Sequence, residues 1–267
     1  MSGWGYIVTS YETVLVTHEG GVSTITLNRP PVNAVSAGLM RDVLAALSEL
    51  EAREETRCVV LTGSGTKAFC AGADLKASGG GPGSGPSFRE LGRSVLDRIE
   101  TFPKPVVAAI RGWCIGGGFA IGMSCDVRLA STTARFRTGD AYIGVVPSWG
   151  MSLTRLTHYI GRNRALDLLI VGEDLDAAGA KEMGLVTRVI PEEEFDAEVA
   201  RIAQRLAGGA PIVFQAIKET VRAQYVHSPG AARELETHWS NICAASADQK
   251  EGLAAQREKR APIFKGR

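Results

Sequence analysis

Two glycine-rich segments hold the residues of this 267-residue chain that are best suited to chemistry. They cover residues 59–75 and 106–120. Each begins with an apolar run that predicts a buried strand and continues into small residues that predict a helix start. The first N–H groups of a helix have no partner inside the helix, and they favour negative charge.

If these two segments lie side by side, two backbone N–H groups can point at a single oxygen atom. Such a pair forms an oxyanion hole, which stabilises negative charge that develops on a carbonyl oxygen. The alternative is that the glycines only allow two strand–turn–helix connections to pack closely, because glycine is common in loops. Packing explains either segment taken alone, so the prediction depends on both together.

Other kinds of site have weaker support. The spacing of Gly116, Gly118 and Gly122 misses the dinucleotide-binding motif by one residue, and no phosphate-binding lysine follows. Ser148 lacks the first glycine of a hydrolase nucleophile elbow. The four histidines are scattered without metal-ligand spacing, so we expect no metal site.

The composition narrows the class of protein. With 30 basic and 29 acidic side chains, the chain has no basic excess, which argues against nucleic-acid or polybasic membrane binding. No apolar run approaches the roughly 18 residues that a membrane helix needs, and the first eleven residues do not resemble a secretory signal. The five cysteines lack a C-x-x-C pair and predict buried free thiols. We therefore expect a cytoplasmic protein.

The surrounding elements follow from periodicity and turn residues. Two β-rich runs around Gly20 and Gly21 predict a hairpin, and Asp176 and Gly184 predict the two ends of one helix. Helical spacing covers 39–50 and 88–101, whereas strands are expected at 58–62, 106–110, 126–130, 134–137 and 185–190.

The order of these elements predicts the fold class. Strands with interleaved helices, followed by a helical tail, indicate an α/β fold. We expect residues 1–200 to form the core and residues 201–267 to form a helical C-terminal subdomain. The Gly-, Ser- and Pro-rich stretch 78–87 predicts a mobile loop.

Seven sequence blocks occur in an order and at spacings that carry more information than any of them alone. The two most specific are AFCAGADLK at residues 68–76 and KPVVAAIRGWCIGGG at residues 104–118. The first block starts at Leu27 and the last contains Phe264. Together they resemble the signature of the enoyl-CoA hydratase/isomerase (crotonase) superfamily over nearly the whole chain.

This resemblance implies a fold, an assembly and a substrate. The fold would be a spiral of ββα units with a helical C-terminal trimerisation subdomain, assembled as a homotrimer or a homohexamer. The substrate would be an acyl thioester of coenzyme A, bound within residues 1–200. No separate cofactor is implied, because coenzyme A is part of the substrate.

The resemblance also assigns roles to single positions. The oxyanion donors would be the N–H groups of Ala73 and Gly117. The substrate-binding positions would be Ala71, Gly72, Asp74, Leu75, Lys76, Gly116 and, near the nucleotide, Phe264.

The acid–base positions depart from the hydratase pattern. Hydratases of the family carry two glutamates that together position one water, and the matching residues here are Ala120 and Asp140. A single carboxylate can still carry a proton, as the double-bond isomerases of the family do. We predict that Asp140 is the one acid/base.

The sequence thus predicts an acyl-CoA-processing enzyme of fatty acid metabolism, either a lyase or an isomerase, that stabilises a thioester enolate. Three alternatives stay open. The same site could serve thioester hydrolysis or decarboxylation, or the chain could bind acyl-CoA without catalysis.

Overall fold

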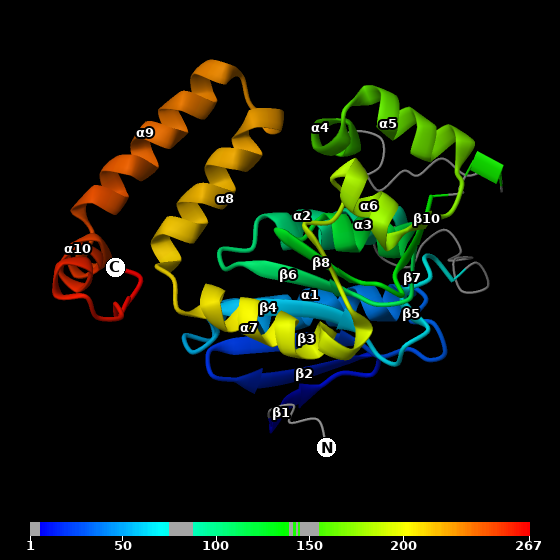
Figure 1. The fold of residues 1–267 in the computed structure, drawn as a ribbon, viewed down its shortest axis with the longest axis horizontal. Coiled ribbons are helices and arrows are strands. Elements are labelled where there is room, and N and C mark those ends of the chain that lie inside the picture. Colours follow the sequence, from blue (N-terminus) through cyan, green and yellow to red (C-terminus); the bar gives the residue numbers. More distant parts are fainter. Residues whose placement is uncertain (1–5, 75–87, 139–140, 143, 145–154) are drawn as a thin grey trace.

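The computed structural model describes residues 6–74, 88–138, 141–142, 144 and 155–267 (Figure 1). Its main sheet has the strand order β1-β2-β3-β4-β6-β8-β11. The strands are β1 (Tyr6–Ser10), β2 (Val14–Glu19), β3 (Val22–Leu27), β4 (Cys58–Gly63), β6 (Val106–Ile110), β8 (Val127–Ser131) and β11 (Arg188–Ile190). The first three strands pair antiparallel, and from β3 to β11 every neighbouring pair is parallel.

The predicted hairpin is confirmed. Strands β2 and β3 pair in register from Val14 opposite Leu27 to Glu19 opposite Val22. Gly20 and Gly21 form the turn with φ values of 55° and 87°, which glycine adopts without steric cost. The edge strand β1 was not predicted from the sequence.

A second, smaller sheet has the order β10-β9-β7-β5. Its strands are β5 (Ala68–Cys70), β7 (Trp113–Ile115), β9 (Arg135–Arg137) and β10 (Leu175–Asp176). Along the chain, β4 is followed by β5 and helix α2 (Phe88–Glu100), and β6 by β7 and helix α3 (Gly117–Met123). This repeat of two strands and a helix confirms the predicted α/β spiral.

Helices cover both faces of the main sheet. On one face, helix α1 (Ala37–Ala52) buries the side chains that the helical spacing predicted, including Leu39, Val43 and Leu47. On the other face, helix α7 (Phe195–Ala207) packs over alternate residues of β4 and β6 (Figure 1). The central strands are therefore buried on both sides, which explains their continuous apolar sequences.

The remaining helices lie towards the C-terminus. They are α4 (Leu156–Ile160), α5 (Arg162–Leu166), the π-helical turn η3 (Asp167–Val171), α6 (Ala177–Met183), the 3-10 turn η4 (Glu192–Glu194), α8 (Pro211–Val226), α9 (Pro229–Ala245) and α10 (Ala247–Glu258). The predicted caps of α6 are confirmed. The Asp176 carboxylate accepts the Gly179 N–H at 2.8 Å, and Gly184 has a left-handed φ of 86°.

The predicted buried free thiols are confirmed for four of the five cysteines. All five are free, and every one except Cys243 is buried. Burial raises the pKa of the Cys58 and Cys70 thiols to about 12, so these thiols stay protonated and act as small apolar side chains. In the described residues no helix is both long and apolar enough to cross a membrane.

Helices α8, α9 and α10 extend away from the sheets, and charged contacts attach them to the body (Figure 1). The ammonium group of Lys218 on α8 lies 2.7 Å from the Asp126 carboxylate, which also accepts the Val106 N–H at 2.7 Å. Burial raises the pKa of Asp126, and the ammonium group of Lys218 acts in the opposite direction. This ion pair joins the helical region to the edge of β6.

Replacing Lys218 should show how much this attachment stabilises the fold. Lys218→Met leaves the partly exposed Asp126 carboxylate without its counter-ion, so we expect the free energy of unfolding in urea to fall by about 1–2 kcal/mol. Adding Asp126→Asn should recover part of the loss, since no unpaired carboxylate then remains. As a control, Arg201→Met removes the exposed pair with Glu198 and should have no measurable effect. Equal stability of Lys218→Met and wild type would contradict the argument.

Candidate functional site

The small sheet brings the two glycine-rich segments together. Strands β5 and β7 pair in parallel, with Ala68 opposite Trp113 and Cys70 opposite Cys114. The residues after β5 therefore run beside the residues after β7. A Cβ atom built on Gly72 would lie 3.6 Å from the backbone nitrogen of Gly117. The side-by-side arrangement on which the sequence prediction depended is therefore present.

Backbone contacts in this region leave no space for side chains. A Cβ atom at Gly118 would lie 2.2 Å from the carbonyl oxygen of Cys70, and one at Gly72 would lie 2.8 Å from that of Ile115. Gly72 has a φ of 84°, and Gly116 combines a φ of 49° with a ψ of −111°. These glycines are thus required for the close packing of the two segments.

The two predicted oxyanion donors have no partner within the described part of the chain. No hydrogen bond there uses the N–H of Ala73 or the N–H of Gly117. Gly117 is the first residue of α3, where helical N–H groups lack an internal partner, and the N–H before it, on Gly116, donates to the Arg137 carbonyl at 3.0 Å. Within the described residues, both N–H groups are therefore left without an acceptor.

A loop after β3 holds the segment that contains Ala73. Val35 donates its N–H to the Gly72 carbonyl at 2.7 Å and accepts the Asp74 N–H at 2.9 Å. The Asp74 carboxylate also pairs with the Arg29 guanidinium at 2.6 Å. Among the predicted substrate-binding residues, Gly72 and Asp74 thus have firm contacts with this loop, and Ala71 donates its N–H to it as well.

The acid–base positions are only partly described. Ala120 lies in α3 with 4% of its surface exposed. Asp140 lies outside the described residues, as do the predicted substrate-binding residues Leu75 and Lys76 and the predicted loop 78–87.

The chain on both sides of Asp140 is anchored to η3. The Thr138 hydroxyl donates to the Leu168 carbonyl at 2.6 Å, and the Tyr142 hydroxyl donates to the Ile170 carbonyl at 2.9 Å. Thr138 is fully buried, whereas Tyr142 is exposed. These anchors were not predictable from the sequence, because a π-helical turn has no pattern that separates it from an ordinary helix.

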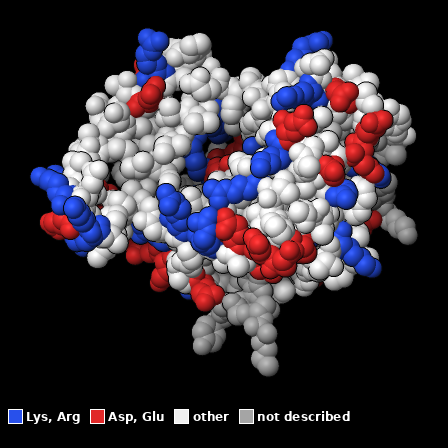
Figure 2. Space-filling view, in the orientation of Figure 1, with Lys and Arg blue, Asp and Glu red and all other residues white. Residues whose placement is uncertain are grey.

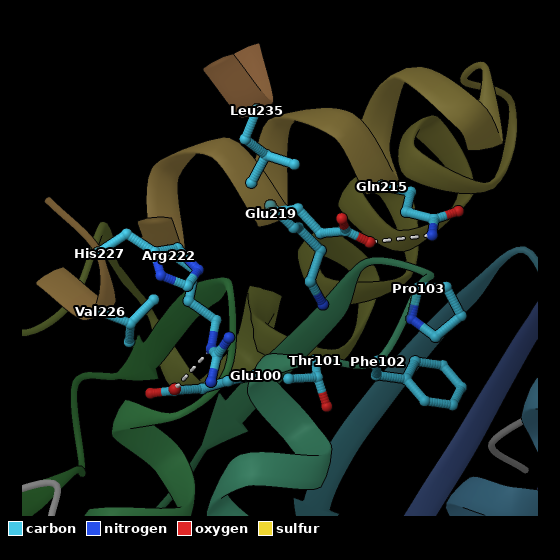
Figure 3. Close-up of a pocket in the computed structure, with 11 residues that line it drawn as sticks. Glu100, Thr101, Phe102, Pro103, Gln215, Glu219, Arg222, Val226, His227 and Leu235 are labelled. Carbon is cyan, nitrogen blue, oxygen red and sulfur yellow. Dashed lines mark hydrogen bonds and ion pairs between the residues drawn. The ribbon is translucent and has the colours of Figure 1, made fainter. Parts of the chain in front are cut away.

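A separate cavity of about 270 Å³ lies between the end of α2 and helix α8 (Figure 3). Its wall contains the buried carboxylate of Glu100, which pairs with Arg155 at 3.2 Å and with Arg222 at 3.8 Å. Burial raises the pKa of Glu100, and the two guanidinium groups oppose that rise. Figure 2, in the orientation of Figure 1, shows basic side chains around a hollow in the molecular surface. No predicted site residue lines this cavity.

Phe264 is not brought to the glycine-rich segments within one chain. The C-terminal tail lies at the opposite side of the molecule from β5 and β7 (Figure 1). The Phe264 carbonyl accepts two hydrogen bonds from the Arg57 guanidinium, both at 3.2 Å. The next two N–H groups, of Lys265 and Gly266, donate to the buried Asp248 carboxylate. The tail is thus fixed near α10.

Known proteins share both this sequence and this fold. The sequence model of the Enoyl-CoA hydratase/isomerase family matches residues 17–267. A probable enoyl-CoA hydratase of Rhizobium meliloti is 38% identical over 265 residues, covering 97% of this chain and all of that protein. The probable enoyl-CoA hydratase echA8 of Mycobacterium bovis is 35% identical over 256 residues, covering 96% of this chain and 98% of that protein.

Solved structures agree with these sequence matches. The enoyl-CoA hydratase of Bacillus anthracis superposes with a TM-score of 0.88 at 31% identity, covering 96% of this chain and 100% of its own. An enoyl-CoA hydratase structure from Geobacillus kaustophilus gives a TM-score of 0.90 at 29% identity, covering 97% and 98% of the two chains.

The close approach of Gly118 to β5 can be tested by adding one methyl group. Gly118→Ala places a Cβ against the Cys70 carbonyl and should lower the free energy of unfolding by about 1–3 kcal/mol. Gly122→Ala in the same helix is the matched control, because its Cβ would meet nothing closer than 3.4 Å. That variant should be as stable as wild type or slightly more stable. Chemical denaturation of both variants measures the difference, and equal stabilities would contradict the described contact.

Proposed function

Because this chain belongs to the enoyl-CoA hydratase/isomerase family of acyl-CoA-processing enzymes, we propose that it stabilises a thioester enolate with the N–H groups of Ala73 and Gly117. We propose that Asp140 carries the proton. The observation that supports this most strongly is the approach of Gly72 to the nitrogen of Gly117, with both N–H groups unused in the described residues.

The chemistry follows from where negative charge develops. The α-proton of a thioester is weakly acidic, and its removal places negative charge on the thioester oxygen. Two fixed N–H donors stabilise that oxygen more as the charge grows, so they lower the barrier rather than only binding the substrate. Loss of one such donor typically raises a barrier by roughly 3–4 kcal/mol.

The residues at the acid–base positions favour transfer of a double bond over hydration. Hydration by two glutamates uses both carboxylates to position one water. Residue 120 is a buried alanine, so it supplies no second carboxylate for this purpose. One carboxylate at Asp140 is sufficient to take a proton from the α-carbon of the acyl-CoA, which forms the enolate, and to return it to another carbon of that enolate. Hydration remains the second candidate, because the similar proteins are named enoyl-CoA hydratases.

We further propose that no cofactor is needed beyond the coenzyme A of the substrate, and that the enzyme works in the cytoplasm. The free, mostly buried cysteines support a reducing compartment.

Product analysis with two substrates tests this proposal. We expect the wild type to convert a 3-enoyl-CoA to its 2-enoyl isomer faster than it hydrates crotonyl-CoA. Asp140→Asn should abolish both reactions while the affinity for the thioester, measured by calorimetry, stays similar. Turnover of malonyl or saturated acyl thioesters would instead favour decarboxylation or hydrolysis. Binding without turnover of any thioester in the panel would indicate a non-catalytic acyl-CoA-binding protein.

We also propose a homotrimer, or a homohexamer built from two trimers, assembled through the helical region. Val213, Ile217 and Val221 recur every four residues along α8 and form an apolar stripe, here called the α8 stripe. Their exposed fractions are 37%, 54% and 61%. A row of exposed apolar side chains on one helix face is typical of a surface that another chain covers.

A charge in the α8 stripe should disrupt this assembly. Ile217→Asp would bury a carboxylate in the interface, so we expect light scattering to show a smaller species than for wild type. The control Ser48→Asp adds the same charge on the exposed face of α1 and should keep the wild-type mass. A monomeric wild type, or a trimeric Ile217→Asp variant, would show that α8 is not the interface.

A further inference from the structure

Asn33 is a fully buried polar residue in the loop that connects β3 to α1. Its Nδ2 donates to the carbonyl oxygens of Ala68 at 2.9 Å and Ser64 at 3.1 Å, and more weakly to that of Phe69 at 3.3 Å. Its Oδ1 accepts the Arg29 N–H at 3.1 Å and the Ser64 hydroxyl at 3.0 Å. One side chain thus joins the loop to the turn between β4 and β5.

The backbone of Asn33 is also specialised. Its φ is 53°, in the left-handed region that asparagine tolerates better than most residues other than glycine. This conformation turns the chain so that the amide faces β5 and Val35 continues towards Gly72.

The loop that Asn33 anchors sets the direction of the Ala73 peptide. Val35 pairs with the carbonyl of Gly72 and with the N–H of Asp74, on either side of Ala73. In an extended segment the N–H groups of successive residues point to opposite sides. If the N–H of Asp74 points at the loop, the N–H of Ala73 points away from it.

We propose that Asn33 is a positioning residue for the oxyanion hole, acting through Val35 to aim the Ala73 N–H. This inference rests on the proposed function, because it assumes that the Ala73 N–H binds the thioester oxygen. Asn33 itself does not touch the substrate. Its amide fixes the loop, and the loop in turn fixes the peptides on both sides of Ala73. The Arg29–Asp74 ion pair is a second contact between the same two segments.

A variant that keeps the backbone but loses the amide tests this role. Asn33→Gly preserves the left-handed conformation and removes all the side-chain hydrogen bonds. Displacement of a catalytic group by about 1 Å can lower the rate about a hundredfold. We therefore expect kcat to fall roughly ten- to a hundredfold while KM changes by no more than about threefold.

A spectroscopic readout separates positioning from general loss of stability. The enolate of acetoacetyl-CoA absorbs in the near ultraviolet, so the ratio of enolate to keto form in the bound ligand reports stabilisation of the oxygen. We expect wild type to raise this ratio, and Asn33→Gly to bind the ligand with a ratio at least about tenfold lower, equivalent to one pKa unit.

Two further variants keep the test decisive. Ser64→Ala removes only the hydroxyl that donates to Asn33 Oδ1, so it should lower the enolate ratio by a smaller factor than Asn33→Gly does. This variant tests the role of Asn33 even if Asn33→Gly does not fold. Ser23→Ala is the matched control: it removes a buried hydrogen bond to Thr56 at the far end of β3 and should leave the ratio unchanged.

The outcomes distinguish this inference from the proposed function. A wild type that raises the enolate ratio, with Ser64→Ala and any folded Asn33→Gly unchanged, would overturn the positioning role alone. A wild type that binds acetoacetyl-CoA without raising the ratio would overturn the oxyanion hole, and the role of Asn33 with it. An equal decrease in Ser23→Ala would show a general effect of destabilisation and would also reject the inference.

Discussion

The main chains of β5, β7 and the start of α3 are in direct contact, with no side chains between them. Gly118 lies against the carbonyl of Cys70, and Gly72 lies against that of Ile115. Such contact needs residues without a Cβ, and it fixes two short strands that have few hydrogen bonds of their own. It also leaves the N–H groups of Ala73 and Gly117 without an acceptor in the described chain. The same contact therefore determines the local fold and the shape of the candidate site.

The rest of the body supports this contact from two sides. Strands β4 and β6 are parallel neighbours, so the two segments that follow them both begin at the carboxyl ends of the main-sheet strands. The loop after β3 contacts the first segment in two ways. The Asn33 amide donates to the Ala68 carbonyl in β5, and the backbone of Val35 pairs with Gly72 and Asp74 after β5. The helical region is attached elsewhere, through the pairs Lys218–Asp126 and Arg222–Glu100. The proposed thioester site and the proposed assembly surface thus lie in different parts of the chain.

Much of this fold could be predicted from the sequence, because the longer elements have regular patterns. The spacing of Leu39, Val43 and Leu47 predicted α1, and Gly20 with Gly21 predicted the hairpin. Strands β5 and β7 were not predicted, because each has only three residues and glycines follow them closely, so the local pattern indicates turns.

The candidate site was predictable to a different degree. The glycine positions indicated that the segments containing Gly72 and Gly117 lie side by side, because glycine is needed wherever main chains touch. The contacts of the Asn33 amide nitrogen were not predictable, since the carbonyl groups that accept from it lie 31 to 36 residues away in the sequence. The same holds for Thr138 and Tyr142, whose acceptors belong to η3. Contacts of this kind depend on tertiary structure, which local patterns do not encode.

A crystal structure of the protein with acetoacetyl-CoA tests the central claim most directly. If the N–H groups of Ala73 and Gly117 form the oxyanion hole, the thioester oxygen should lie about 2.7–3.1 Å from both backbone nitrogens. A thioester oxygen bound by only one of them, or bound elsewhere in the molecule, would contradict the account.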